Sequence, residues 1–176
     1  DSVKNYRSAK GVSASRIRTI SYGKERPVAV CDNISCWSQN RRGVTVLGAA
    51  YNSCCLDPRI DATIQVSGGP LPFEGGTYEG DPERPMLLVH VSADETVPIN
   101  VGDVVFDTFA IPIWYLRIDG ATHSGVFGGE AGELFDEASL AFLAAELRGD
   151  DDALEAMAGT AEASGIADWR VRTAAG

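Results

Sequence analysis

The chain has 176 residues, 44% of them hydrophobic, and a formal net charge of −10. This length favours one domain with a sizeable core, and no stretch approaches the roughly 18 consecutive apolar residues of a membrane span. Residues 1–50 hold nine Lys/Arg against three acids, a net charge of +6, so residues 51–176 carry −16. We interpret this contrast as two segments of different ancestry. The acidic balance and the lack of a basic stripe with interleaved aromatic residues argue against nucleic-acid binding.

The first segment is predicted to form a helix, a strand and a loop. Residues 1–10 have a polar helical pattern, and Gly11 follows as a typical helix end. No secretory leader is predicted in this opening. Residues 16–22 alternate apolar and polar side chains, which predicts a half-buried strand, and residues 43–47 predict a second short strand after a loop over 23–40.

The four cysteines divide into two pairs. Cys31 and Cys36 enclose a short polar loop, where a disulfide is plausible in an oxidising compartment. Adjacent Cys54 and Cys55 cannot easily bond one another, so we expect them to be buried as small apolar residues. Zinc would require paired C-x₂-C spacing or added histidine ligands, and a nucleotide would require a glycine-rich fingerprint. We therefore predict neither a metal nor a cofactor.

Residues 11–46, GVSASRIRTISYGKERPVAVCDNISCWSQNRRGVTV, resemble the C-terminal part of an OmpA-like peptidoglycan-associated lipoprotein (Pal) domain. SYGKERP and NRR are the most distinctive matches, and the resemblance covers about residues 1–47. The family binds the diaminopimelate-bearing peptide of peptidoglycan through residues of the other half of its domain, so the resemblance assigns no binding residue here. Asn40-Arg41-Arg42 would either contact anions or form a solvated structural turn.

The second segment alternates strands and helices. Strands are predicted at 62–66, 86–91 and 113–118, and helices at 101–109 and 134–147. This alternation predicts a parallel sheet with helices on its faces. Within the last helix, Leu134, Ala138, Ala141 and Ala145 have helical spacing and are expected to pack on the sheet. The tail, residues 150–176, is weakly helical, and Asp150-Asp151-Asp152 suit its beginning.

Two of the predicted strands end in polar turns that carry candidate catalytic residues. Asp94 follows the first in LLVHVSADETVP, and His123 follows the second in DGATHSGVF. Sites on parallel sheets lie beyond the carboxyl ends of strands, and an acid followed by a histidine is the chain order of α/β-hydrolase triads. The histidine would move the nucleophile's proton, while Asp94 would orient the imidazole. Glu95 is a rival acid, and without a triad Asp94 would sit in an Asx-type turn before Pro98.

The nucleophile of such a triad is not recognisable. No G-x-S-x-G motif occurs in the chain. The Ser–Gly pairs are Ser67-Gly68, Ser124-Gly125 and Ser164-Gly165, and none has a glycine two residues before the serine. Ser67 is expected to end the strand 62–66. His90 is expected to be a core or turn histidine.

LGAAYNSCCLDPRIDATIQVSGGPLPFEGG, with the later ADETVP and GATHS motifs, resembles bacterial esterases related to dienelactone hydrolases and chlorophyllases over roughly residues 45–176. The resemblance implies catalytic roles for Asp94 and His123. We expect an α/β fold in which a partial α/β-hydrolase-type parallel sheet with flanking helices (48–176) is joined to an OmpA-like αβ-β fragment (1–47). The two parts could form one composite domain.

Three functions follow as hypotheses. In the first, the chain is an ester hydrolase that acts on a small-molecule ester, or it is an inactive relic of such an enzyme. Alternatively it is a peptidoglycan- or envelope-binding module, or a folded chimera without selected activity. Exposed sheet edges would favour homo-oligomers. The parent families are periplasmic or outer-membrane-associated for 1–47 and cytoplasmic or secreted for 48–176, so the localisation stays open.

Overall fold

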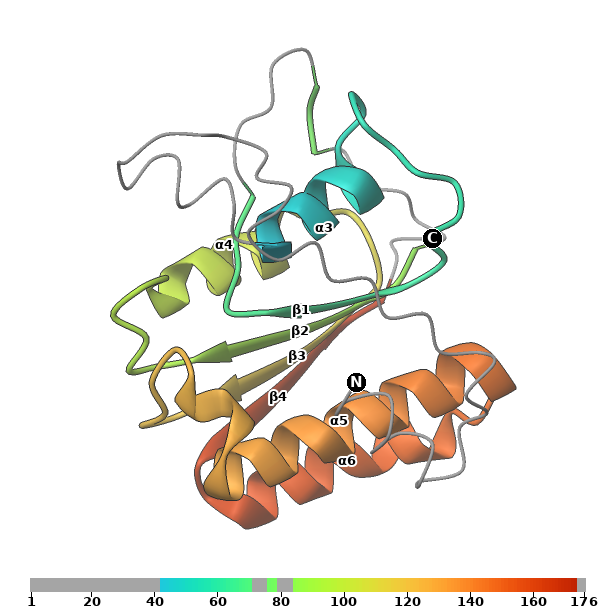
Figure 1. Cartoon of the computed structure of the whole chain (residues 1–176). Coiled ribbons are helices and arrows are strands. Elements are labelled where there is room, and N and C mark those ends of the chain that lie inside the picture. The colour runs from blue at the N-terminus through green and yellow to red at the C-terminus, as the bar shows by residue number, and fades with distance from the viewer. Residues whose placement is uncertain (1–41, 71–75, 79–83, 174–176) are drawn as a thin grey trace. The chain divides into compact units, whose positions relative to one another are not determined.

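The computed structural model describes residues 42–70, 76–78 and 84–173. The chain divides into two units, Asp1–Asn40 and Arg41–Gly176, and every described element belongs to the second (Figure 1). The helix, strand and loop expected before residue 41, including the Cys31–Cys36 pair and Asn40-Arg41, lie outside the described residues. In the described part, no helix combines the length and the apolar character needed to cross a membrane.

The described part is a mixed α/β structure. Its elements, in chain order, are α3 (Arg42–Tyr51), β1 (Thr63–Val66), β2 (Met86–Val91), α4 (Ile99–Thr108), β3 (Ile113–Ile118), the short 3-10 helix η3 (Gly125–Phe127), α5 (Gly129–Arg148), α6 (Asp152–Ser164) and β4 (Ala167–Arg172). The predicted strands and helices of the second segment are thus confirmed, with α5 beginning five residues earlier than the pattern indicated.

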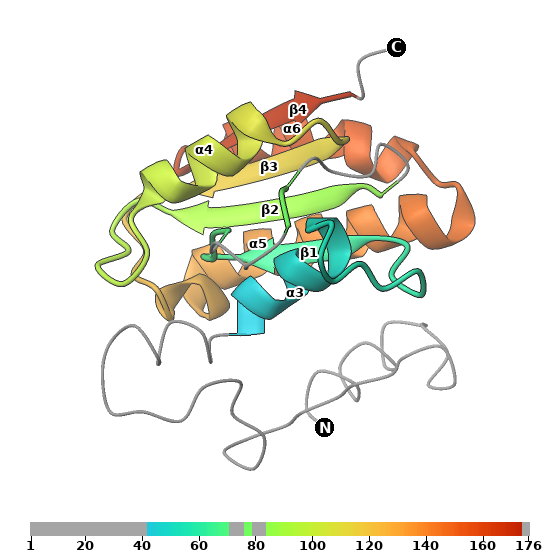
Figure 2. The same cartoon turned by 90° about the horizontal axis from the view of Figure 1, so that it is seen from above.

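The four strands form one sheet in the order β1-β2-β3-β4, seen from above in Figure 2. β1, β2 and β3 are parallel, as predicted, and β4 pairs antiparallel with β3. The sequence predicts only a weakly helical tail over 150–176; the structure corrects this, because β4 follows α6 there. Its alternation of Trp169 and Val171 with charged residues has the period of a strand, but it directly follows a helix and is short.

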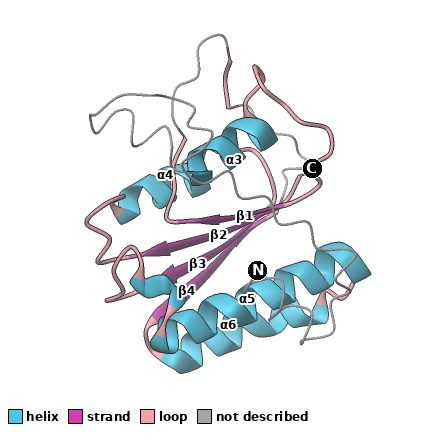
Figure 3. Ribbon diagram, viewed as in Figure 1, coloured by secondary structure: helices cyan, strands magenta, loops and turns pink. Residues whose placement is uncertain are grey.

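Helices cover both faces of the sheet, with α3 and α4 on one side and α5 and α6 on the other (Figures 1 and 3). Successive residues of a strand point to opposite faces, so Met86 and Leu88 of β2 pack with α3 and α4 while Leu87, Val89 and Val91 pack with α5 and α6. All six residues of β2 are buried. A strand buried on both faces explains why its sequence is a continuous apolar run.

Helix α3 replaces the short strand that we predicted at 43–47. Leu47, Ala50 and Tyr51 are buried together against β2 and β3, at the three- and four-residue spacing of one helical face. The Tyr51 hydroxyl also lies 2.6 Å from the Thr63 hydroxyl and donates to the Pro85 carbonyl at 3.2 Å. These tertiary contacts outweigh the β-branched residues at the start of the segment, whose propensity alone favours a strand.

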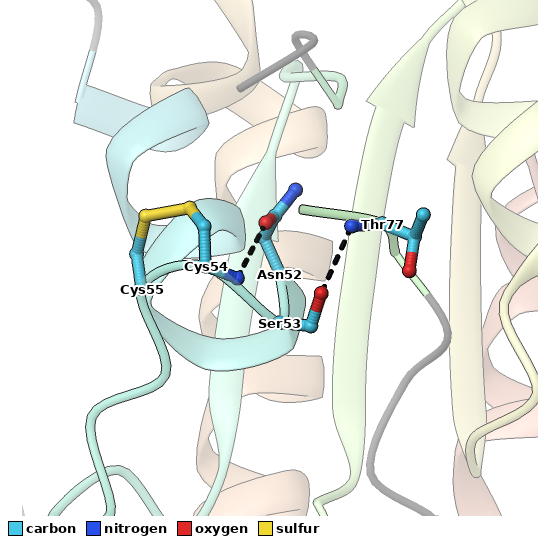
Figure 4. Close-up of a disulfide and its surroundings, with 5 residues drawn as sticks. All are labelled: Asn52, Ser53, Cys54, Cys55 and Thr77. Atoms are coloured by element: carbon cyan, nitrogen blue, oxygen red, sulfur yellow. Dashed lines mark hydrogen bonds between the residues drawn. A yellow bond between two sulfur atoms is a disulfide. The ribbon is translucent and has the colours of Figure 1, made fainter. Parts of the chain in front are cut away.

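Cys54 and Cys55 form a disulfide between neighbouring residues in the turn after α3 (Figure 4). The Asn52 side chain accepts a hydrogen bond from the Cys54 N–H at 3.0 Å. Two hydrogen bonds join Ser53 to Thr77. The Ser53 N–H donates to the Thr77 carbonyl, and the Ser53 hydroxyl accepts from the Thr77 N–H, each at 3.0 Å. Our expectation of two buried, unbonded thiols was wrong, because this turn brings both cysteines to the surface and joins their sulfurs.

The disulfide predicts the alkylation pattern of the chain. Disulfide sulfurs are not nucleophilic, so Cys54 and Cys55 should resist iodoacetamide even in guanidinium, where access is not limiting. After treatment with dithiothreitol, peptide mass mapping should find both alkylated. Alkylation of both cysteines in the unreduced chain would contradict the bond.

Candidate functional site

The carboxyl ends of β2 and β3 meet at one edge of the sheet, where three hydrogen bonds hold their loops together. The Ser92 N–H donates to the Ile118 carbonyl at 2.8 Å, and the Ala93 N–H donates to the Ala121 carbonyl at 3.2 Å. The Gly120 N–H donates to the Ser92 hydroxyl at 2.9 Å. This cross-linking places the turn after β2 beside the loop after β3, as the parallel pairing predicts.

Asp94 and His123 lie together at this edge, as predicted from their places after neighbouring strands. The His123 Nδ1 is 2.8 Å from the Asp94 Oδ2. The other carboxylate oxygen, Oδ1, accepts hydrogen bonds from the N–H groups of Thr96 and Val97, each at 2.8 Å. The predicted Asx-type turn and the predicted acid–histidine contact therefore coexist, since the carboxylate uses one oxygen for each.

The Asp94 carboxylate is buried and stays ionised. Its side chain is fully buried, and burial alone would raise its pKa. Hydrogen bonds from the Val97 N–H, His123 and the Thr96 N–H outweigh this effect and hold the pKa of Asp94 below its ordinary value. Neighbouring Glu95 is exposed, and Asp94 alone of the two bonds the imidazole. Of the two carboxylates considered for the acid role, Asp94 is therefore the one that contacts His123.

His123 presents the opposite side of its ring to a more open environment. Its side chain is 40% exposed, and it lies in the loop that leads into η3 and α5. Within the described ranges, no group hydrogen-bonds its Nε2. With Nδ1 held by a carboxylate, Nε2 is the atom able to take a proton from water or a hydroxyl. The structure therefore brings an acid and a histidine together, and no described serine or cysteine side chain hydrogen-bonds the imidazole.

His90 is a buried core histidine, as expected, and it also fastens the turn that holds Asp94. Its Nε2 donates to the Val97 carbonyl at 2.8 Å, and the Val97 N–H in turn donates to Asp94. Burial lowers the pKa of His90 despite the opposing effect of that carbonyl, so the ring is neutral near pH 7. A Cβ at Gly102 would lie 2.6 Å from the His90 Nδ1, so α4 packs its backbone directly on the ring. The sequence does not predict this hydrogen bond from His90 to the turn, because the bond depends on how the turn folds back over the strand.

Ser67 follows the last residue of β1, where the strand was predicted to end, in an unusual backbone conformation. Its φ of +44° is the only positive value at a non-glycine residue in the described part of the chain. Its N–H donates to the Val89 carbonyl at 2.8 Å, which holds it beside β2. The next residue, Gly68, packs closely on the Gln65 side chain, since a Cβ there would lie 1.7 Å from the Gln65 Nε2. The sequence signals this tight turn only through its consecutive glycines.

The remaining serines of the Ser–Gly pairs offer no nucleophile. Ser124 is exposed and precedes η3 without bonding His123. The Ser164 hydroxyl donates to the Ala161 carbonyl at 2.7 Å and accepts the Ile166 N–H at 3.2 Å, so it is engaged at the end of α6. Residues 42–70, 76–78 and 84–173 contain no group of three or more His, Cys, Asp or Glu side chains able to hold a metal ion.

Comparisons with known proteins find similarity to one family over part of the chain. A stretch of 47 residues is 70% identical to the peptidoglycan-associated lipoproteins of Agrobacterium fabrum and of Rhizobium meliloti, and covers 27% of this chain and 27% of each relative. A 42-residue stretch is 76% identical to the Mesorhizobium japonicum protein of the same name and covers 24% of this chain and 25% of that protein.

The chain thus spans about a quarter of the length of these curated relatives. No family model matches it. The Pal resemblance is confirmed over this share of the chain, whereas the esterase resemblance of residues 45–176 finds no support in these comparisons and stays a proposal.

The lowered pKa of Asp94 predicts how stability depends on pH. A carboxyl whose folded pKa lies below its unfolded value of about 3.9 stabilises the fold above that value and loses this contribution as the pH falls through the folded pKa. Asp94→Asn should therefore reduce the free energy of unfolding by about 2 kcal/mol at pH 7, since hydrogen bonds to a charged group are lost. The difference from the unsubstituted chain should shrink as the pH is lowered from about 5 towards 3.

Urea denaturation of both chains across this pH range measures the effect. Asp119→Asn is the matched control, because it removes the same charge from an exposed position at the end of β3. An unchanged gap between pH 7 and pH 3 would contradict the assignment of an ionised, hydrogen-bonded Asp94.

Proposed function

We propose that the Pal-like stretch associates this chain with peptidoglycan. The observation that carries the proposal is the identity of 70% over 47 residues with proteins named peptidoglycan-associated lipoprotein. The net charge of +6 over residues 1–50 supports it, since a basic segment suits the carboxylate-bearing peptides of the cell wall. Because the chain spans about a quarter of those relatives, the proposal concerns attachment and not the full role of a Pal protein.

Co-sedimentation with isolated peptidoglycan sacculi tests this function. The full chain should appear in the pellet. Arg41→Ala combined with Arg42→Ala should reduce the pelleted fraction if, of the two alternatives for Asn40-Arg41-Arg42, these arginines contact the anionic groups of peptidoglycan. The charge-matched control combines Arg59→Ala with Arg148→Ala, both exposed, and should pellet like the unsubstituted chain. Retention of the full chain in the supernatant would exclude the proposal. An equal loss of pelleted protein in both double variants would show that binding depends on the net charge of the chain and not on Arg41 and Arg42.

A second function is favoured by the geometry after β2 and β3. We propose that Asp94 and His123 are the acid and base of a hydrolytic site for small-molecule esters, within an α/β-hydrolase-type half-sheet. Their 2.8 Å contact carries this proposal. His123 Nε2 would remove a proton from the attacking water or hydroxyl, and the buried carboxylate would stabilise the imidazolium that forms. The oxygen that attacks the ester would come from water or a hydroxyl.

Hydrolysis of p-nitrophenyl acetate by the full chain tests this second function. His123→Ala should reduce the rate above background about 100-fold or more, the usual contribution of a general base, and Asp94→Asn should also reduce it. Asp119→Asn should leave the rate unchanged. If the unsubstituted chain is no faster than buffer while it unfolds cooperatively, the hydrolase proposal fails and the reading of a folded chimera without esterase activity stands.

A further inference from the structure

We propose that Ser67 is a positioning residue for the Asp94–His123 pair, which it serves by donating its hydroxyl to the Asp94 carboxylate. The inference rests on the second proposed function, because it concerns how the acid of that pair is held. Its basis is the convergence of three strand ends, with Ser67 after β1, Asp94 after β2 and His123 after β3. The sequence alone predicts for Ser67 only that it ends a strand.

The hydrogen bonds of Asp94 leave room for one more donor. A carboxylate accepts about four hydrogen bonds, two at each oxygen. Oδ1 already accepts two, from the Thr96 and Val97 N–H groups, whereas Oδ2 accepts one, from the His123 ring. A buried carboxylate is costly unless it is well bonded. A second donor at Oδ2 would complete its shell and fix the oxygen that orients the imidazole.

The hydroxyl of Ser67 meets this need. The residue is 5% exposed, and its Oγ makes no hydrogen bond of good geometry with any described group. It nevertheless lies close enough to Asp94 to contribute to the lowered pKa of that carboxyl. Buried hydroxyls seldom lack a hydrogen-bond partner. A small rotation of the Ser67 side chain would let its hydroxyl donate to the charged Asp94 carboxylate.

The backbone of Ser67 is held where this bond requires it. A positive φ is rare for a residue with a side chain and persists only when the surroundings enforce it. Here the N–H bond to Val89 fixes the residue against β2. On the other side, a Cβ at Gly69 would lie 2.2 Å from the Val101 Cγ1, so the turn packs directly on the first turn of α4. Strained conformations of this kind cluster at functional sites.

The contact with the acid distinguishes this role from that of a nucleophile. A triad serine would bond the imidazole Nε2, and no such bond joins Ser67 to His123. Ser67 instead acts on the reaction through Asp94. It is followed by two glycines and a proline, not by the helix that carries a nucleophile on its first turn.

The test measures the titration of the Asp94 carboxyl by carbon NMR in the full chain. In Ser67→Gly the midpoint should move to higher pH, because a donor to the charged form is lost, while glycine accepts the positive φ without strain. Ser67→Ala should show the same direction. Ser139→Ala is the matched control, since Ser139 is 1% exposed and its hydroxyl is also unpartnered, but it lies within α5. Its Asp94 titration should match that of the unsubstituted chain.

An unchanged Asp94 titration in folded Ser67→Gly would overturn the proposal, and so would an equal shift in Ser139→Ala. Covalent labelling of Ser67 by a fluorophosphonate, located by peptide mass mapping, would also overturn it by making Ser67 the nucleophile. These measurements need no turnover, so they stay informative if the ester assay fails. An unmoved titration together with a loss of hydrolysis in His123→Ala would reject the role of Ser67 alone.

Discussion

The parallel pairing of β2 with β3 is the constraint on which the described structure depends. The two strands pair over six residues each, from Met86 with Ile113 to Val91 with Ile118. β2 is buried along its whole length between two helical layers. Parallel strands must be covered on both faces, so this pair requires both α3 with α4 and α5 with α6. The same pairing brings two polar turns to one edge.

At that edge the buried carboxylate of Asp94 is stabilised without a permanently charged partner such as a lysine or an arginine. Asp94 is stabilised mainly by backbone N–H groups of its own turn, and the turn is in turn tied to β2 through the neutral ring of His90. The carboxylate is therefore in place before any proton moves on His123. Such prior organisation is what the proposed acid–base role of Asp94 and His123 would require.

The sequence indicated much of this arrangement because its signals were local and strong. The apolar runs of β2 and β3 are long and end abruptly, so the positions of Asp94 and His123 after them could be predicted from chain order and the geometry of parallel sheets. The fourth strand was missed because its alternating pattern is brief and follows a clear helix. Its antiparallel pairing with β3 depends on where the chain returns, which no local pattern specifies.

Other features depend on contacts that are distant in the sequence. α3 contains β-favouring residues at its start and becomes helical because Leu47, Ala50 and Tyr51 have a core to enter. The positive φ of Ser67 and the hydrogen bond of His90 to Val97 arise only once three strand ends have converged. The vicinal disulfide likewise depends on the shape of one turn. For such features, composition and spacing supply the chemical groups but not their partners.

The Cys54–Cys55 bond has a further consequence for how this unit responds to its surroundings. A cross-link stabilises a protein largely by restricting the unfolded chain, and the restriction grows with the length of the loop it closes. A disulfide between neighbouring residues closes almost no loop. Its reduction should therefore leave the sheet and its helices as stable as before. Its influence is confined to the surface turn between α3 and β1, where reduction would replace a rigid ring with two separate thiols.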